Sequence, residues 1–200
     1  MAKPNVVSKR DLLDSAKTCI VEQGMDKLTL KAVAEGAGVT QGTVYYHFRT
    51  KEQLLFEIVK DLCESSWEQV ENNDAPRHQK LQEALKGAHK RCTSDLFYHQ
   101  LFFSLLAYSF QHEKTKEQLN NLLSFENETL SRQLASLWDT SPVEGVSFDT
   151  WGILLNALVD GLAIQALLSD SFPADKVYSE LESLLTYRAT KNKEEECEKK

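Results

Sequence analysis

Apolar residues recur every three or four positions along most of the chain, a spacing that predicts amphipathic α-helices and no convincing strand. In the first sixty residues the predicted helices are mostly short, and each is preceded by a hydroxyl residue suited to capping: Ser8, Thr29, Thr40 and Thr50. Ser8 with Asp11, and Thr50 with Gln53, have the spacing of capping boxes. Gly24 supplies a stop for the first helix.

From about residue 76 the apolar pattern continues over longer segments. We expect helices over residues 76–92, 95–111, 113–138 and 148–168, and a last helix from about 173 to 188. The sequence therefore predicts an all-α chain of about nine helices.

The stretch from Thr29 to Lys51 has the spacing of a helix, a glycine-containing turn and a second short helix, which is the pattern of a helix-turn-helix. Its apolar positions can hold the two helices together. The positions left facing outward carry hydrogen-bonding or flat groups of the kind that contact DNA: Gln41, Gly42, Thr43, Tyr46 and His47. A generic helical hairpin with an aromatic end is the alternative.

The run Val-Thr-Gln-Gly-Thr-Val-Tyr-Tyr-His-Phe-Arg-Thr-Lys-Glu-Gln-Leu-Leu resembles the signature of the tetracycline-repressor (TetR) family of bacterial regulators, and the resemblance extends from about Ser8 to Trp67. It implies an all-helical homodimer with a three-helix DNA-binding domain and a helical body. On this basis we expect a helix-turn-helix domain over residues 8–67, an effector-binding and dimerisation domain over 68–190, and a flexible charged tail over 191–200.

The resemblance also implies a set of DNA-contacting residues. These are Thr29, Lys31, Thr40, Gln41, Gly42, Thr43, Tyr45, Tyr46, His47 and Lys51. Within the set, Gln41 is expected to read a base edge and Lys51 to bind phosphate at the start of the following long helix. Two alternatives stay open: Tyr45 can belong mostly to the core, and His47 can bond a neighbouring backbone group.

Six aromatic residues lie between positions 97 and 110, and an aromatic helix is by default part of a core. In the TetR family the corresponding helices line a ligand cavity, so both interpretations are kept. The expected effector pocket consists of Phe97, Tyr98, Phe102, Phe103, Tyr108, Phe110 and Trp151.

Residues 151–168 are apolar around nearly the whole helix, with small residues that permit close approach of a second helix. Part of this segment resembles the helix that, with the last helix, forms the dimer interface of many TetR-family members. The expected dimer contacts are Ala157, Gly161, Gln165, Leu168, Val177, Leu181 and Leu184. A core helix buried within one subunit is the alternative.

Charge and composition narrow the function classes. Residues 1–60 carry nine Lys or Arg against seven Asp or Glu, while the whole chain has a net charge of −7, which argues against non-specific coating of nucleic acid. No secretory signal is seen, and no run is judged to reach the roughly 20 apolar residues of a membrane span. We therefore expect a cytoplasmic protein.

The sequence contains no motif that indicates catalysis, and no cofactor is expected. The spacings of His78, His89, His99 and His112 do not suit a helical metal site, and the four cysteines are far apart, so no metal is expected.

Together these patterns predict a ligand-responsive transcriptional repressor that binds a palindromic DNA operator as a homodimer. A small hydrophobic or amphipathic effector would release it from the DNA, and the DNA-bound protein would be associated with the nucleoid. Activation in place of repression stays open. The alternative class is a helical protein-interaction adaptor without DNA readout.

Overall fold

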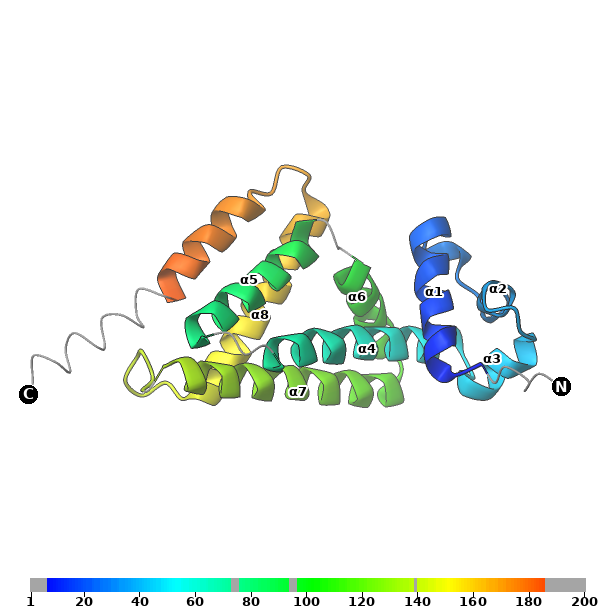
Figure 1. Ribbon diagram of the computed structural model, residues 1–200, viewed down its shortest axis with the longest axis horizontal. Helices are drawn as coiled ribbons and strands as arrows, with labels where there is room; N and C mark the ends of the chain where they lie inside the picture. The colour runs from blue at the N-terminus through cyan, green and yellow to red at the C-terminus, as the bar shows by residue number, and fades with distance from the viewer. Residues whose placement is uncertain (1–6, 73–75, 94–96, 139, 186–200) are drawn as a thin grey trace, which may run out of the picture. The chain divides into compact units, whose positions relative to one another are not determined.

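The computed structural model describes residues 7–72, 76–93, 97–138 and 140–185, in which every regular element is a helix (Figure 1). The predicted all-α class is confirmed. The chain divides into two compact units, Met1–Asp61 and Leu62–Lys200, called here the N-terminal and C-terminal units. Their boundary falls inside a helix, ahead of the expected division between residues 67 and 68. The expected tail over 191–200 lies outside the described residues.

The N-terminal unit contains four short elements and the start of a long helix. These are α1 (Lys9–Gln23), the 3₁₀ turn η1 (Met25–Lys27), α2 (Leu30–Gly36), α3 (Gln41–His47) and the first half of α4 (Lys51–Glu71). All except η1 were expected from the sequence.

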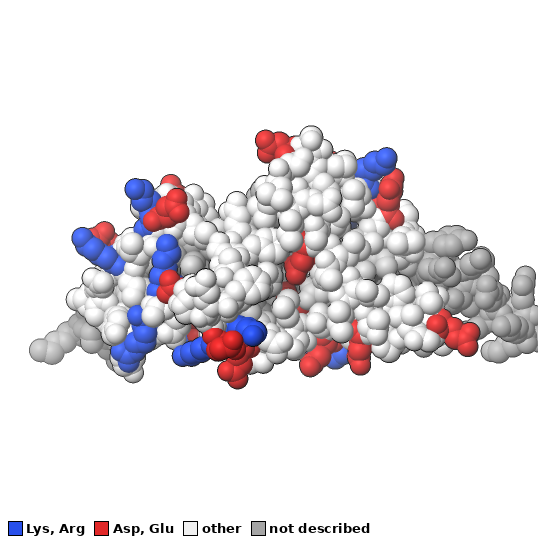
Figure 2. Space-filling model, turned by 180° about the vertical axis from the view of Figure 1, so that it is seen from behind, with Lys and Arg blue, Asp and Glu red and all other residues white. Residues whose placement is uncertain are grey.

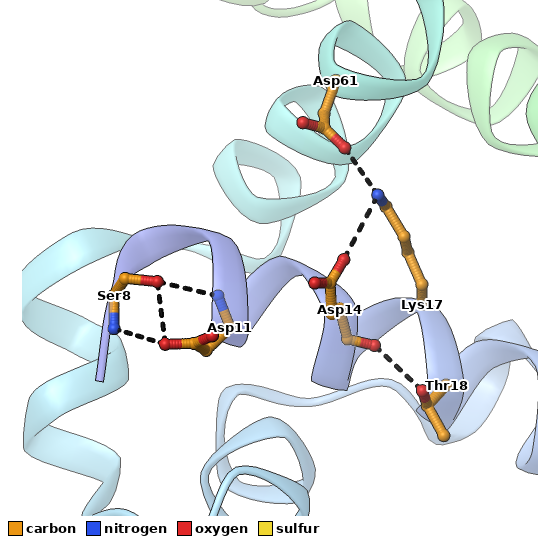
Figure 3. A network of polar contacts seen from close by, with 6 residues as sticks. All are labelled: Ser8, Asp11, Asp14, Lys17, Thr18 and Asp61. Atoms are coloured by element: carbon orange, nitrogen blue, oxygen red, sulfur yellow. Dashed lines mark hydrogen bonds and ion pairs between the residues drawn. The ribbon is translucent and has the colours of Figure 1, made fainter. Parts of the chain in front are cut away.

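The expected helix caps are present at all four hydroxyl residues. Ser8 and Asp11 form a reciprocal capping box at the start of α1, which Figure 3 shows in close-up. Thr29 accepts a hydrogen bond from the backbone of α2, and Thr40 does the same for α3. Thr50 Oγ1 accepts from the Gln53 backbone at 3.1 Å. These bonds satisfy N–H groups that a helix start leaves unpaired, so they fix where each short helix begins.

A small apolar core joins these helices. Side chains with no exposed surface come from every element of the unit except η1, among them Leu12, Val33, Val44, Phe48 and Ile58. Outside this core, Lys17 on α1 forms an ion pair with Asp61 on α4, drawn in Figure 3. Because α3 contributes Val44 to the same core, the opposite face of this seven-residue helix is presented outward.

Among the described residues, the C-terminal unit contains the second half of α4 and five further helical elements. They are α5 (Arg77–Thr93), α6 (Phe97–Ser109), α7 (Glu113–Leu137), α8 (Phe148–Leu168) and a helical segment over residues 174–185. Each lies within a few residues of its predicted range, and α8 matches it. The expected end of the last helix at residue 188 lies outside the described residues.

The core of the C-terminal unit is built where α5, α7, α8 and the 174–185 segment meet. Trp138 at the end of α7 is buried and packs edge-on against Trp151 of α8, with ring centroids 5.7 Å apart. Trp151 also donates from its indole nitrogen to Ser141 Oγ at 3.2 Å. The loop between α7 and α8 is thereby tied to the core.

Helix α8 corrects one expectation. By length and composition alone, α8 could cross a membrane. The expectation that no run is long and apolar enough to span a membrane was therefore wrong. Asp149 and Asp160 interrupt the apolar run of α8, but the helix as a whole stays apolar enough. In the structure α8 packs along α7, while a second face of the helix stays exposed.

Candidate DNA interface and effector cavity

Helices α2 and α3 are joined by a tight turn in which Gly38 adopts a positive φ of 65°. The backbone N–H of Val39 donates to the Ala34 carbonyl at 2.9 Å, which fixes the chain as it leaves α2. Since Val33, Ala34 and Val44 are buried between the helices of the unit, the pair forms the helix-turn-helix that the sequence predicts.

The leading face of α3 is exposed, as a recognition helix requires. Gln41 and Gly42 begin the helix and are exposed, and Tyr46 is 74% exposed. Thr43 and His47 are half-buried, and the His47 ring lies edge-on to Tyr46 with centroids 5.2 Å apart. Side chains of base-reading and phosphate-binding type therefore share one surface.

Gly42 is not required by the fold of this helix. A Cβ built on it would meet only Thr40 Oγ1, at an ordinary contact distance of 3.6 Å. The absence of a side chain thus leaves room on the outward surface of α3. That room is available to an approaching molecule.

Tyr45 follows on the same side of α3 and is 51% exposed, so it is not a core residue. The guanidinium of Arg49 lies over its ring, 5.1 Å from the centroid. Arg49 could not be identified from the sequence, because nothing in the order of residues indicates that its side chain folds back over an aromatic ring.

The cations expected at the interface are partly engaged within the protein. Lys51 is half-buried, and its Nζ donates to the Met25 carbonyl of η1 at 3.1 Å. Lys31 lies one helical turn from Glu35, with 3.7 Å between the charged atoms, and both side chains are exposed. Thr29 is used as the cap of α2. In Figure 2 Lys and Arg side chains on the N-terminal unit alternate with carboxylates.

The C-terminal unit contains adjoining cavities of about 280, 140 and 80 Å³. Trp67 of α4 lines all three. The largest is bordered by α4, α5, α6 and α7, and its lining includes Leu62, Cys63, Ser66, Trp67, Gln69, Gly87, Lys90, Tyr98 and Glu126. The smallest is the most apolar and continues toward α8 and residues 181–185.

Glu126 is the polar centre of these cavities. Its Oε1 accepts hydrogen bonds from the Tyr98 hydroxyl at 3.1 Å and from Cys63 Sγ at 3.3 Å. Glu126 lines both the largest and the smallest cavity, so any molecule that filled both would lie against this carboxylate.

Of the seven aromatic residues expected at the pocket, only Tyr98 is among the described lining residues of these cavities. Phe102 is buried and stacks on Tyr98, while Trp151 packs on Trp138. The others lie elsewhere: Phe97 and Phe103 are half-buried, Tyr108 stacks on His112, and Phe110 is 75% exposed. Large rings fill the space around themselves, whereas the cavities open beside small residues of α5, such as Ala84 and Gly87, which no sequence pattern indicated.

The residues expected at a dimer interface differ in how far they are exposed in the single chain. Ala157, Gln165, Leu168 and Leu184 are exposed, and Gly161 and Val177 are half-buried. Leu181 is buried in the core and lines the smallest cavity. The exposed face of α8 also contains large apolar side chains that were not predicted: Ile153, Leu154, Leu158 and Ile164.

Comparisons with known proteins agree with the helix-turn-helix. Residues 12–58 match the family described as bacterial regulatory proteins, tetR family. The transcriptional repressor KstR2 of Mycolicibacterium smegmatis is 36% identical over 58 residues, which cover 28% of this chain and 28% of the repressor. The chain therefore matches little more than a quarter of that relative's length.

Two further likenesses extend over most of the chain. The transcriptional regulator BetI of Escherichia coli is 27% identical over 183 residues, covering 85% of this chain and 87% of BetI. The FadR regulator of Bacillus subtilis, solved in complex with stearoyl-CoA, shares the fold with a TM-score of 0.60 at 19% identity, covering 89% of this chain and 97% of FadR. The helix-turn-helix over residues 12–58 therefore belongs to the tetR family of bacterial regulatory proteins, and most of the chain shares the fold of solved transcriptional regulators.

Proposed function

We propose that this protein is a transcriptional regulator that binds a palindromic DNA operator as a homodimer and acts by binding, without catalysis. The observation that carries the proposal is the outward face of α3, where Gln41, Gly42 and Tyr46 are exposed while Val44 is buried. In this proposal residues 8–67 bind DNA, and residues 68–190 bind the effector and form the dimer.

The exposed face of α8 supports a second copy of the chain as the dimer partner. Leu154, Leu158 and Leu168 are each more than two-fifths exposed, although large apolar side chains are normally covered. Seen from behind, the C-terminal unit has a broad area without charged side chains (Figure 2). Gly161 lies within this face, and a Cβ added to it would meet no atom within 4 Å, which leaves room for close helix packing.

The cavities beside Trp67 support a small effector with an apolar body and a polar group. The lining of the smallest cavity is mostly apolar, with Glu126, Gln133 and Asn156 among its polar groups. The largest cavity has a more polar lining, which includes Ser66, Gln69 and Lys90. These residues replace most of the expected aromatic set as the proposed effector site, and Tyr98 is kept.

The two recognition helices of a dimer must lie about 34–36 Å apart to enter successive major grooves on one side of DNA. An effector that binds better to a conformer with another separation would release the operator, because only its differential affinity shifts the equilibrium. The protein would then act as a repressor in the cytoplasm, associated with the nucleoid when bound to DNA.

The test of DNA binding is enrichment of duplexes from a random pool by the full-length protein. We expect a palindromic sequence to be enriched, and Gln41→Ala to weaken binding by about 1–3 kcal/mol and relax preference at one base pair in each half-site. Gln79→Ala, a matched change at an exposed position of α5, should leave binding unchanged. Failure to enrich any duplex would favour the protein-interaction adaptor.

The effector site is tested by mass spectrometry of small molecules that co-purify with the protein. Ala84→Phe fills space in the two smaller cavities and should reduce the recovered amount, provided the variant is folded. Phe110→Ala removes a ring from the surface and should not. Equal recovery from both variants would place the effector elsewhere.

A further inference from the structure

Arg49 stands directly after the recognition helix and is held at two points. Its backbone N–H donates to Gln53 Oε1 at 3.1 Å, which fixes the main chain against the first turn of α4. Its guanidinium lies 5.1 Å from the centre of the Tyr45 ring, within the range of a cation–π interaction. Both side chains are exposed, so the pair lies on the protein surface.

Arg49 differs from the other cations close to α3 in what its charged group contacts. Lys9 pairs with Glu57 at 2.7 Å, Lys31 lies 3.7 Å from Glu35, and Lys51 donates to a backbone carbonyl. In the part of the chain that the structure describes, no carboxylate lies within 4.0 Å of the Arg49 guanidinium. Among the described residues, no ion pair therefore neutralises the charge that lies over the Tyr45 ring.

Arg49 lies just beyond the C-terminal end of α3, the helix proposed to contact the bases. Gln41 and Tyr45 are four residues apart and share one helix face, about 6 Å apart along the axis. Arg49 lies a further four residues along the chain, beyond the end of the helix at His47. Since the major groove is about 12 Å wide, a residue that follows the end of a short helix lying in the groove is placed toward the sugar-phosphate edge.

Stacking on a ring orders a guanidinium without using its N–H donors, because these point outward in the plane of the group. A side chain ordered in advance loses less conformational entropy when it binds. Resting on the proposed function, we propose that Arg49 binds a DNA phosphate at the edge of the groove that receives α3. Tyr45 is a positioning residue that holds Arg49 through its ring.

The experiment measures affinity for a fluorescein-labelled duplex enriched by the wild-type protein, between about 50 and 200 mM salt. Arg49→Gln removes one phosphate contact per protomer and two per dimer, so the slope of log affinity against log salt should fall by about two. Affinity should fall about tenfold or more. Arg132→Gln, the same change at an exposed arginine of the C-terminal unit, should alter neither quantity.

The role of Tyr45 is separated by two variants. Tyr45→Phe keeps the ring and should retain wild-type affinity and slope, whereas Tyr45→Leu should weaken binding several-fold, with thermal melts confirming that each variant is folded. The double variant Tyr45→Leu/Arg49→Gln should bind no more weakly than Arg49→Gln, because the ring acts through the guanidinium.

Several results would overturn the inference. An unchanged salt slope in Arg49→Gln would remove Arg49 from the interface while leaving DNA binding by the protein intact. A loss in Tyr45→Phe equal to that in Tyr45→Leu would assign the contact to the tyrosine hydroxyl. Fully additive losses in the double variant would show that Tyr45 and Arg49 act separately. A wild-type protein that enriches no duplex would overturn the proposed function together with this inference.

Discussion

The side chain of Asn156 on α8 donates a hydrogen bond to the side chain of Asn127 on α7, 2.9 Å away. One helical turn earlier on α8, Gly152 is buried, and a Cβ at that position would lie 2.4 Å from the backbone carbonyl oxygen of Asn127. The two helices therefore approach each other closely where a polar side-chain contact and a missing side chain coincide.

Gly152→Ala should destabilise the protein by about 1–3 kcal/mol, because the new methyl group meets backbone atoms that cannot move aside on their own. Urea unfolding followed by far-UV circular dichroism measures the change. An unfolding midpoint at or above that of the wild type would show that α7 and α8 separate at little cost.

Gly42→Ala, in contrast to Gly152→Ala, should not destabilise the protein. The added methyl group fits within the protein and improves helix propensity by up to about 1 kcal/mol, so thermal stability should stay equal or rise. DNA affinity should nevertheless fall, because the methyl group occupies the outward surface of α3. Fluorescence anisotropy with an enriched duplex decides the matter; unchanged affinity would mean that DNA does not approach Gly42.

Leu168→Glu should convert the proposed dimer to monomers in sedimentation velocity while each protomer stays folded. Leu168 is 82% exposed in the single chain, so a carboxylate there is solvated in the monomer and desolvated only in an interface. Val21→Glu is the matched control, since Val21 is 76% exposed on α1 of the N-terminal unit. A dimer that survives Leu168→Glu and dissociates with Val21→Glu would place the interface elsewhere.

The capping box gives a pH prediction. Hydrogen bonds from the backbone and side chain of Ser8 lower the pKa of Asp11 below its usual value. The carboxylate therefore adds stability at pH values above the unfolded pKa of about 3.9, and this contribution is lost as the pH falls through the lower folded pKa.

Ser8→Ala removes the hydroxyl donor and keeps the backbone N–H, so it should raise the pKa of Asp11 only part of the way toward its ordinary value in an NMR titration of the carboxyl carbon. It should also lower thermal stability near neutral pH, with a smaller difference from the wild type in acid. Ser15→Ala is the control, since Ser15 Oγ donates to the Val33 carbonyl and does not contact Asp11. An Asp11 pKa unchanged by Ser8→Ala would contradict the contribution assigned to the Ser8 hydroxyl.

The helices of this protein could be predicted because their signals are local. Ser8, Thr29 and Thr40 each cap the helix that follows within three residues, and the apolar spacing of α8 lies entirely within α8. The turn η1 was missed, since Met25–Lys27 has neither a side-chain cap nor an apolar repeat to indicate it.

The contacts within the candidate sites could not be predicted in the same way, because they join residues far apart in the sequence. The Met25 carbonyl binds Lys51 across 26 positions, and Glu126 collects donors from Cys63 and Tyr98. The cavity depends on which small residues of α5 face the gap beside Trp67, a property of the packed helices and not of any single pattern.

The placement of tryptophan has a consequence for spectroscopy. The chain contains three tryptophans, and all of them belong to the C-terminal unit: Trp67 at the cavities, and Trp138 and Trp151 in the core. Emission excited selectively in indole therefore originates only from that unit, with Trp67 placed to respond when the cavity is filled. Tyr45 and Tyr46 are the only tyrosines of the N-terminal unit, and their fluorescence offers a separate optical signal for the helix-turn-helix.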